Sequence, residues 1–264
     1  MNTVTSIVAE SAKDAIDFGS RFRAYRTEAK FEFLRMLRTP AFAVPMLVLP
    51  IMLYVLFAAL IFGENTAKDP RLALYMFASY VVFAATTPGM FGFGTGLAGE
   101  RQSGMLRLKR ALPMPFAGNL IAKACMSLGV VILVLSILLV LATWIGHLHF
   151  DAIQIAIIFA VAGLSAMCSC ALGFFIGSMV PGQAAPGVVN LIYFPMMYLS
   201  GMFFPLPAFL AKWAIIWPTF YMDQLVVAAG GGKAFVAPSM CVGILLGITV
   251  LFGGLAIHRF SRRG

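Results

Sequence analysis

The sequence predicts an all-α integral membrane protein with six transmembrane helices. Three observations indicate this fold class. Hydrophobic residues make up 61% of the 264 residues and charged residues only 11%, whereas soluble domains carry about 25% charged residues. The mean hydropathy is +0.94. Uncharged apolar runs of about 20 residues, the length that crosses a bilayer at about 1.5 Å per residue, recur between short polar segments.

The chain begins with two polar segments. We expect residues 1–19 to form a cytoplasmic leader and residues 20–39 an amphipathic helix. A basic amphipathic helix beside a membrane span is typical of a helix lying flat on the lipid headgroups, and the alternative is a solvated cytoplasmic helix. Basic residues such as Arg26 fill much of its polar face. The apolar face holds Phe22, Tyr25, Ala29, Phe33 and Met36, at spacings of 3 and 4 residues.

Residues 40–258 are interpreted as a single transmembrane domain, followed by a cytoplasmic tail at 259–264. No charged residue lies in the middle of any expected span. Lys123 lies near the start of the third span, where its long stem would let the ammonium group reach the surface. The expected spans are residues 41–62, 72–97, 119–144, 152–179, 187–203 and 238–257.

Residues 204–236 match neither a span nor a plain loop. Pro205, Pro207 and Pro218 interrupt them, and Trp213 and Trp217 are four residues apart on one helical face. Tryptophan prefers the membrane interface. We therefore expect short re-entrant helices that enter the bilayer partway from the outside.

The distribution of basic residues predicts the orientation. Lys and Arg are concentrated before the first span, in the loop at 99–115 and in the tail, and they are sparse in the remaining loops. Because basic loops stay in the cytoplasm, both termini and the 99–115 loop are expected on the cytoplasmic side of the cell (inner) membrane. The net charge of +9 is then explained without a nucleic acid partner.

Several kinds of chemistry are missing from the sequence. The lack of charges inside the spans argues against ion-coupled carriers, voltage sensors and intramembrane enzymes. No GxxxxGK[ST] motif is present, so we expect no catalytic residues and no cofactor of its own in this chain. His147 and His149 leave a metal site open, although two ligands alone do not make one and surface histidines are the alternative. If the chain transports, another protein must supply the work.

Two motifs resemble those of type-2 ABC exporter permeases, a family of drug and polysaccharide exporters. The first is ERQSGML at 100–106, followed by Pro113, and the second is LSGMFFP at 199–205, followed by two tryptophans. An amphipathic helix before the first span is also similar. The chain departs from the common pattern at Met105, where the family often has Thr, and at Arg107, where it often has an acid.

The resemblance implies a dimer of six-span subunits, each docked on a separate ATPase subunit that binds ATP and Mg. The loop between spans 2 and 3 would be the coupling helix, and residues 20–39 the connecting helix. A helix held by Glu100 would then make charge-assisted contacts to the ATPase; the alternative is that its basic residues only set topology. The coupling residues would be Glu100, Arg101, Gly104, Met105, Leu108 and Arg110. The connecting-helix residues would be Phe22, Tyr25, Arg26 and Phe33.

The resemblance also implies that cargo passes through a seam lined by spans 2 and 5. Residues at helical spacing on those spans would line this seam. The alternative, for any one of them, is that its side chain packs against lipid. The expected cargo is a hydrophobic or amphipathic small molecule, such as a drug, antibiotic or lipid. Alternatives are export of a lipid-linked polysaccharide and a non-transporting anchoring or assembly subunit. The candidate pathway residues are Phe83, Thr87, Met90, Asn190, Phe194 and Met197.

Overall fold

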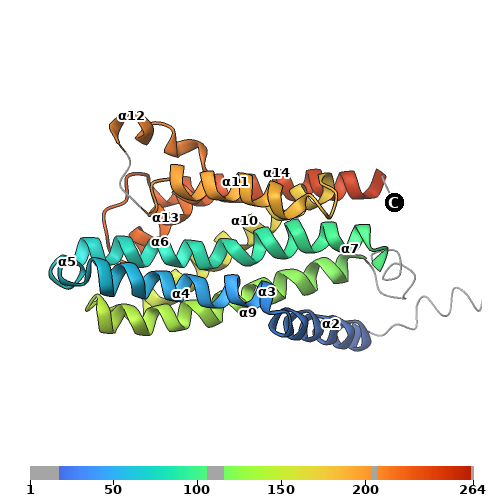
Figure 1. The fold of residues 1–264 in the computed structure, drawn as a ribbon, viewed down its shortest axis with the longest axis horizontal. Coiled ribbons are helices and arrows are strands. Elements are labelled where there is room, and N and C mark those ends of the chain that lie inside the picture. The colour runs from blue at the N-terminus through green and yellow to red at the C-terminus, as the bar shows by residue number, and fades with distance from the viewer. Residues whose placement is uncertain (1–17, 106–115, 204–206, 263–264) are drawn as a thin grey trace, which may run out of the picture.

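The computed structural model describes residues 18–105, 116–203 and 207–262, and within these ranges the chain is helical, without strands (Figure 1). The all-helical membrane fold is thereby confirmed, and the six-span topology stays a prediction. Four helical segments are long and apolar enough to cross a membrane, and two shorter apolar ones accompany them. The four are Pro70–Gln102, Gly118–Ile145, Ala152–Met179 and Pro238–Phe260, and the two are Met46–Ile61 and Ala185–Leu199.

The first expected span is helical but irregular. After α2 (Phe18–Arg38), the chain runs through α3 (Pro40–Ala43), the π-helix η1 (Val44–Val48), α4 (Leu49–Tyr54) and the π-helix η2 (Val55–Ile61). Pro45 and Pro50 lack the N–H group that an α-helix requires at each interior position, so a regular ladder cannot continue through this segment. The expected loop that follows contains the short helix α5 (Gly63–Lys68).

The second expected span is part of a longer helical rod. It comprises α6 (Pro70–Gly89), the π-helix η3 (Met90–Leu97) and α7 (Ala98–Gln102). Asp69 caps its start by accepting a hydrogen bond from the Arg71 amide at 2.9 Å. Gly104 follows its end with φ of +75°, a conformation that glycine adopts readily. Glu100 and Arg101 therefore lie on an extension of the second span, which was expected to end at residue 97.

The remaining helices follow the prediction more closely. Asp151 and Gln154 form a capping box at the start of α10, which has the predicted bounds. Short helices occupy the expected re-entrant region. The elements are α9 (Phe116–Ile145), α10 (Ala152–Met179), α11 (Ala185–Leu199), α12 (Ala208–Ala211), the 3₁₀-helix η4 (Ala214–Ile216), α13 (Pro218–Ala229) and α14 (Pro238–Arg262).

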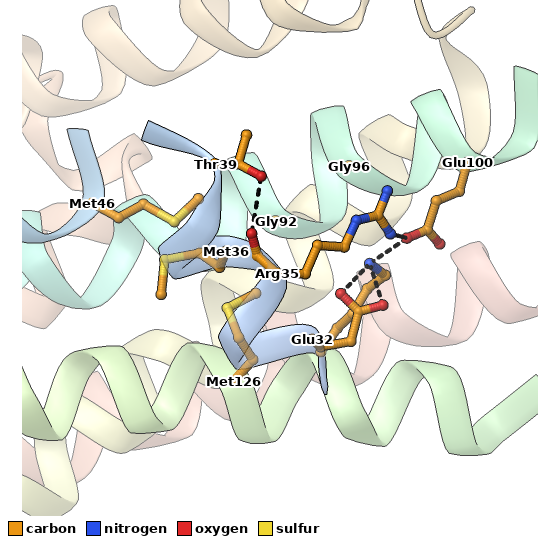
Figure 2. A pocket seen from close by; sticks show the side chains of 10 residues that line it. Glu32, Arg35, Met36, Thr39, Met46, Gly92, Gly96, Glu100 and Met126 are labelled. Carbon is orange, nitrogen blue, oxygen red and sulfur yellow. Dashed lines mark hydrogen bonds and ion pairs between the residues drawn. The ribbon is translucent and has the colours of Figure 1, made fainter. Parts of the chain in front are cut away.

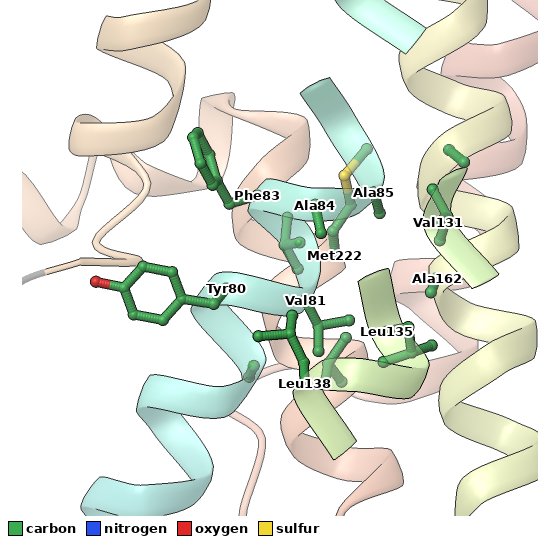
Figure 3. Packing of buried hydrophobic residues seen from close by; sticks show 14 of the residues in the cluster. Tyr80, Val81, Phe83, Ala84, Ala85, Val131, Leu135, Leu138, Ala162 and Met222 are labelled. Atoms are coloured by element: carbon green, nitrogen blue, oxygen red, sulfur yellow. The ribbon is translucent and has the colours of Figure 1, made fainter. Parts of the chain in front are cut away.

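The rod from α6 to α7 is the most enclosed of the four long helical segments. Figure 3 shows α6 side chains such as Val81 packed among residues of α9, α10 and α13. Its contact with α10 is unusually close: a Cβ atom on Gly173 would lie 2.4 Å from the Gly89 carbonyl oxygen, and one on Gly177 would lie 2.6 Å from that of Phe93. Small residues of this kind let the backbones of two membrane helices touch.

The two ends of the bundle differ in charge. Helices α2 and α7 and the C-terminal end of α14 lie at one end, which we call the basic end, and α5 and α12 lie at the opposite end (Figure 1). Among the described residues, the basic side of α2, Arg101 of α7 and Arg259 near the end of α14 thus belong to one end of the bundle, as the orientation prediction requires. That this side faces the cytoplasm stays a prediction.

Gly173→Ala is expected to destabilise the protein, because its methyl group would collide with a backbone atom that cannot move aside. The cost should be about 1–3 kcal/mol, seen as a lower melting temperature of the purified protein. Gly163→Ala on the same helix is the matched control, since its Cβ would meet only Leu128 Cδ2 at 3.8 Å. Equal melting temperatures of the two variants would contradict the close contact.

Candidate functional site

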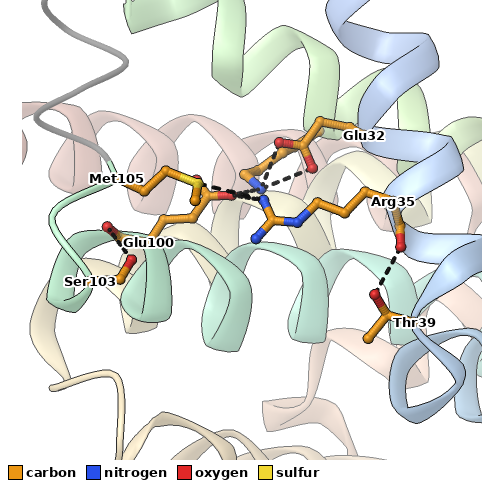
Figure 4. A network of polar contacts seen from close by, with 7 residues as sticks. Glu32, Arg35, Thr39, Glu100, Ser103 and Met105 are labelled. Atoms are coloured by element: carbon orange, nitrogen blue, oxygen red, sulfur yellow. Dashed lines mark hydrogen bonds and ion pairs between the residues drawn. The ribbon is translucent and has the colours of Figure 1, made fainter.

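Four charged side chains meet at the basic end, and we call them the charge junction: Glu32 and Arg35 from α2, Glu100 from α7 and Lys123 from α9 (Figure 4). Lys123 Nζ lies 2.8 Å from Glu100 Oε1 and 3.4 Å from each carboxylate oxygen of Glu32. Arg35 Nη1 lies 3.2 Å from Glu100 Oε1. Acidic and basic groups thus alternate along the junction, and three helices are joined by it.

Most of the junction is shielded from solvent. Lys123 is 3% exposed, Glu100 4% and Glu32 7%, whereas the Arg35 side chain is 54% exposed. Buried charges are tolerated when they are paired and hydrogen-bonded, because their desolvation costs several kcal/mol each. A close pair recovers about 4 kcal/mol at an effective dielectric constant of about 20. The junction therefore fixes how three helices meet more than it adds net stability.

Local sequence explains why these groups converge. Glu32 precedes Phe33 on α2, which packs against α9. Phe33 lies close to Gly129 in this contact. Met36, one turn later, is also buried. Lys123 differs from the prediction: its ammonium group turns inward, because two carboxylates are within reach there. Sequence analysis missed Glu32, although an acid on the apolar face of a basic helix was a usable signal.

A cavity of about 150 Å³ lies beside the charge junction (Figure 2). Its apolar wall is built by Met36, Met46 and Met126, and Gly92 and Gly96 of η3 leave room for it. Methionine side chains adapt to differently shaped neighbours. The cavity thus joins a flexible apolar wall to a charged one, an arrangement suited to an amphipathic group.

The predicted coupling residues do not share one direction. Glu100 turns into the charge junction, and Arg101 donates to the carbonyl oxygens of Ser178 and Val180 at 2.6 and 2.7 Å. Both side chains therefore bind within the chain, where contact with a partner was expected. Met105 is exposed, with its sulfur 4.0 Å from Arg35 Nη1. Gly104 follows the end of the rod, and Leu108 and Arg110 lie outside the described residues.

Residues 20–39, expected to form the connecting helix, lie almost entirely in α2, and the connecting role stays a prediction. Phe33 is half-buried against α9, and Arg26 is exposed, as the amphipathic pattern predicts. Phe22 and Tyr25 belong to α2, and their side chains lie outside what the structure describes. Phe31 on the opposite face is exposed. The helix thus packs one face on α9 and leaves another uncovered.

The candidate pathway residues of span 2 are buried within the chain. Phe83, Thr87 and Met90 are enclosed, and Thr87 Oγ1 lies 2.7 Å from the Tyr193 hydroxyl of α11. Tyr193 is also 3.0 Å from the Thr86 hydroxyl. The structure therefore places this face of span 2 against span 5, and Tyr193, which sequence analysis missed, joins the two. A tyrosine in an apolar span opposite two adjacent threonines was the available signal.

The candidate pathway residues of span 5 do not share one environment. Phe194 is 51% exposed, Asn190 is half-buried and Met197 is buried. Helical spacing placed them near one face, but of these three residues only Phe194 is exposed. Whether any of the six candidates meets cargo stays a prediction.

The second motif is fixed by the N-terminal half of α6. The Tyr75 hydroxyl donates to the Gly201 carbonyl, and the Ser79 hydroxyl donates to the Met202 carbonyl. Gly201 has φ of +78°, which explains a glycine at this turn. Span 2 thus holds the start of the segment that leads to the predicted re-entrant helices.

The two histidines of the sequence pattern lie in the loop between α9 and α10. His149 Nδ1 lies 2.9 Å from the backbone carbonyl of His147. Within the described ranges, no group of three or more His, Cys, Asp or Glu residues is placed to hold a metal ion. The described residues therefore add no third ligand to the metal site that His147 and His149 suggested.

Lys123→Met should lower the free energy of unfolding by about 3–5 kcal/mol, because it leaves two buried carboxylates without their shared cation. Lys68→Met is the matched control, since the Lys68–Glu64 pair at 3.3 Å is exposed and such pairs contribute about 0.3–0.5 kcal/mol. Chemical unfolding in mixed micelles measures both. A small, equal effect of the two variants would refute the structural role of the charge junction.

A comparison with protein families identifies the chain's family. A family model described as ABC-2 type transporter matches residues 23–229, from α2 through the charge junction to the end of α13. No curated protein sequence matches the chain. Because the family match covers most of the chain, this membrane protein belongs to the ABC-2 type transporter family and is a permease subunit of an ABC transporter.

Proposed function

We propose that this permease exports a hydrophobic or amphipathic small molecule, such as a drug, antibiotic or lipid, from the cytoplasm or the inner leaflet. It works as a homodimer on two copies of a nucleotide-binding ATPase, which hold ATP and Mg. The chain itself catalyses no reaction. Its basic end faces the cytoplasm, and six spans cross the inner membrane. The observation that carries the proposal is the charge junction.

The charge junction is suited to receive force from a partner. It joins the end of the rod to α2 and α9, so a push on α7 acts on all three helices. A buried charge that loses its partner is strongly destabilising, so we expect the three helices to move together and keep the pairs intact. Met105 is exposed directly beside the junction, and the basic loop that follows it supplies further contacts to the ATPase.

The cargo class follows from the apolar character of the spans. Their middle sections carry no charged residue, so a strongly charged cargo would lack a partner there. The cavity beside the charge junction combines three methionines with charged groups. Such a lining favours a molecule with an apolar body and a polar end.

Purification of the tagged permease from its native membranes tests the proposal. An ATPase polypeptide with a P-loop should copurify in equal molar amount and hydrolyse ATP in a vanadate-sensitive manner. In lipid nanodiscs, some members of a panel of hydrophobic and amphipathic compounds should stimulate ATP hydrolysis. Glu100→Ala should reduce the stimulated rate about tenfold, equivalent to about 1.4 kcal/mol, because it disconnects α7 from α2 and α9.

Glu64→Ala is the control. Glu64 is exposed, and its described ion pair is with Lys68 of the same short helix, α5. The variant should leave hydrolysis unchanged. Copurification of no ATPase would overturn the proposal and favour an anchoring subunit. Stimulation by lipid-linked glycans alone would replace the small-molecule cargo with a polysaccharide.

A further inference from the structure

The end of α10 is clamped by a side chain of the rod. Arg101 Nη1 donates to the Ser178 carbonyl at 2.6 Å, and Nη2 donates to the Val180 carbonyl at 2.7 Å. The last carbonyl groups of a helix have no partner within it, and a cation at this end also complements the helix dipole. The planar guanidinium group reaches both oxygens at once, which an ammonium group cannot do in the same geometry.

The turn after α10, residues 180–184, rests directly on α7. The Gln183 amide donates to Gln102 Oε1 at 2.9 Å. A Cβ atom on Gly182 would lie 2.7 Å from Gln102 Oε1 and 2.9 Å from the Ala98 carbonyl oxygen. Gly182 therefore lies against the Ala98 backbone and the Gln102 side chain with no side chain of its own between them, and a displacement of α7 meets the turn's backbone.

The turn leads into α11 without a flexible connection. The Ala184 and Ala185 amides donate to the Pro181 carbonyl at 3.1 and 3.0 Å, and α11 begins at Ala185. Farther along α11, the Val189 side chain fills the space above Gly94, where an added Cβ atom would lie 2.7 Å from Val189 Cγ2. The base of α11 is thus attached to α7 and its next turn to η3.

We infer that Arg101 and Gln102 are positioning residues that make the turn at 180–184 and the base of α11 move with α7. They act through backbone atoms of this chain, without touching the ATPase or the cargo. The inference rests on the proposed function, since it requires an ATPase that displaces α7. It extends that function by identifying α11 as a driven helix, alongside the α2 and α9 helices held by the charge junction.

Hydrogen–deuterium exchange of the permease–ATPase complex in nanodiscs tests the inference. The complex is compared without nucleotide and after trapping with ADP and vanadate. In the wild type, peptides covering residues 98–105 and 180–190 should both change their exchange between the two states. Arg101→Ala should keep the change at 98–105 and lose roughly half or more of it at 180–190, because the connection between the two segments is weakened.

Arg101→Lys and Gln102→Ala are the second variants, each removing part of the connection. Each should lose less of the change at 180–190 than Arg101→Ala, and Gln102→Ala decides the matter should Arg101→Ala fail to fold. Arg71→Ala, an exposed arginine at the opposite end, is the matched control and should behave as wild type. ATPase binding and basal hydrolysis should stay within about twofold in all variants.

Three results would count against the inference in different ways. If the exchange of residues 180–190 responds as in the wild type in both Arg101→Ala and Gln102→Ala, the inference is overturned and the proposed function is not. Loss of ATPase binding in Arg101→Ala would also overturn it, because Arg101 would then be a contact for the partner. Absence of an ATPase from the wild-type preparation would overturn the proposed function, and the inference with it.

Discussion

The ammonium group of Lys123 determines how the basic end is assembled. A buried cation must be paired and hydrogen-bonded, and here its carboxylate partners come from two different helices, at 2.8 and 3.4 Å. Helices α2 and α7 must therefore approach α9 at one point. The position of the amphipathic helix, the end of the rod and the methionine-lined cavity all follow from that convergence.

The rod from α6 to α7 is held along its whole length. The charge junction and Arg101 hold it at the basic end, Tyr193 contacts it midway, and Tyr75 and Ser79 connect its other half to the segment after α11. Most of these attachments end on backbone carbonyls or on charges. The rod is therefore a common support to which the amphipathic helix, α10 and α11 are each attached directly.

Much of the fold was predictable from the sequence. Hydropathy predicts the long helices, because a helix that crosses the bilayer needs about 20 consecutive apolar residues. Helices α10 and α14 begin where spans were expected, near residues 152 and 238, although their crossing of a membrane stays a prediction. The rod beyond residue 97 was not predicted, because Glu100 and Arg101 look like the start of a solvent-exposed loop until their buried partners are known.

The candidate site was predictable only in part. Helical periodicity indicates which residues share a face, but it does not say which distant segment that face meets. Glu32, Glu100 and Lys123 are far apart in the sequence, so their convergence had no local signal. Phe83, Thr87 and Met90 do share a face, but the rod is enclosed on nearly all sides, so a common face does not mean a channel lining.

The contact between Gly89 and Gly173 has a consequence for permeation. Where two helix backbones touch with no side chains between them, nothing as thick as an acyl chain or an aromatic ring can enter. The seam between α6 and α10 is thus a sealed wall of the protein, impermeable to cargo and to lipid alike. Any route for a transported molecule must run along a different boundary of the subunit.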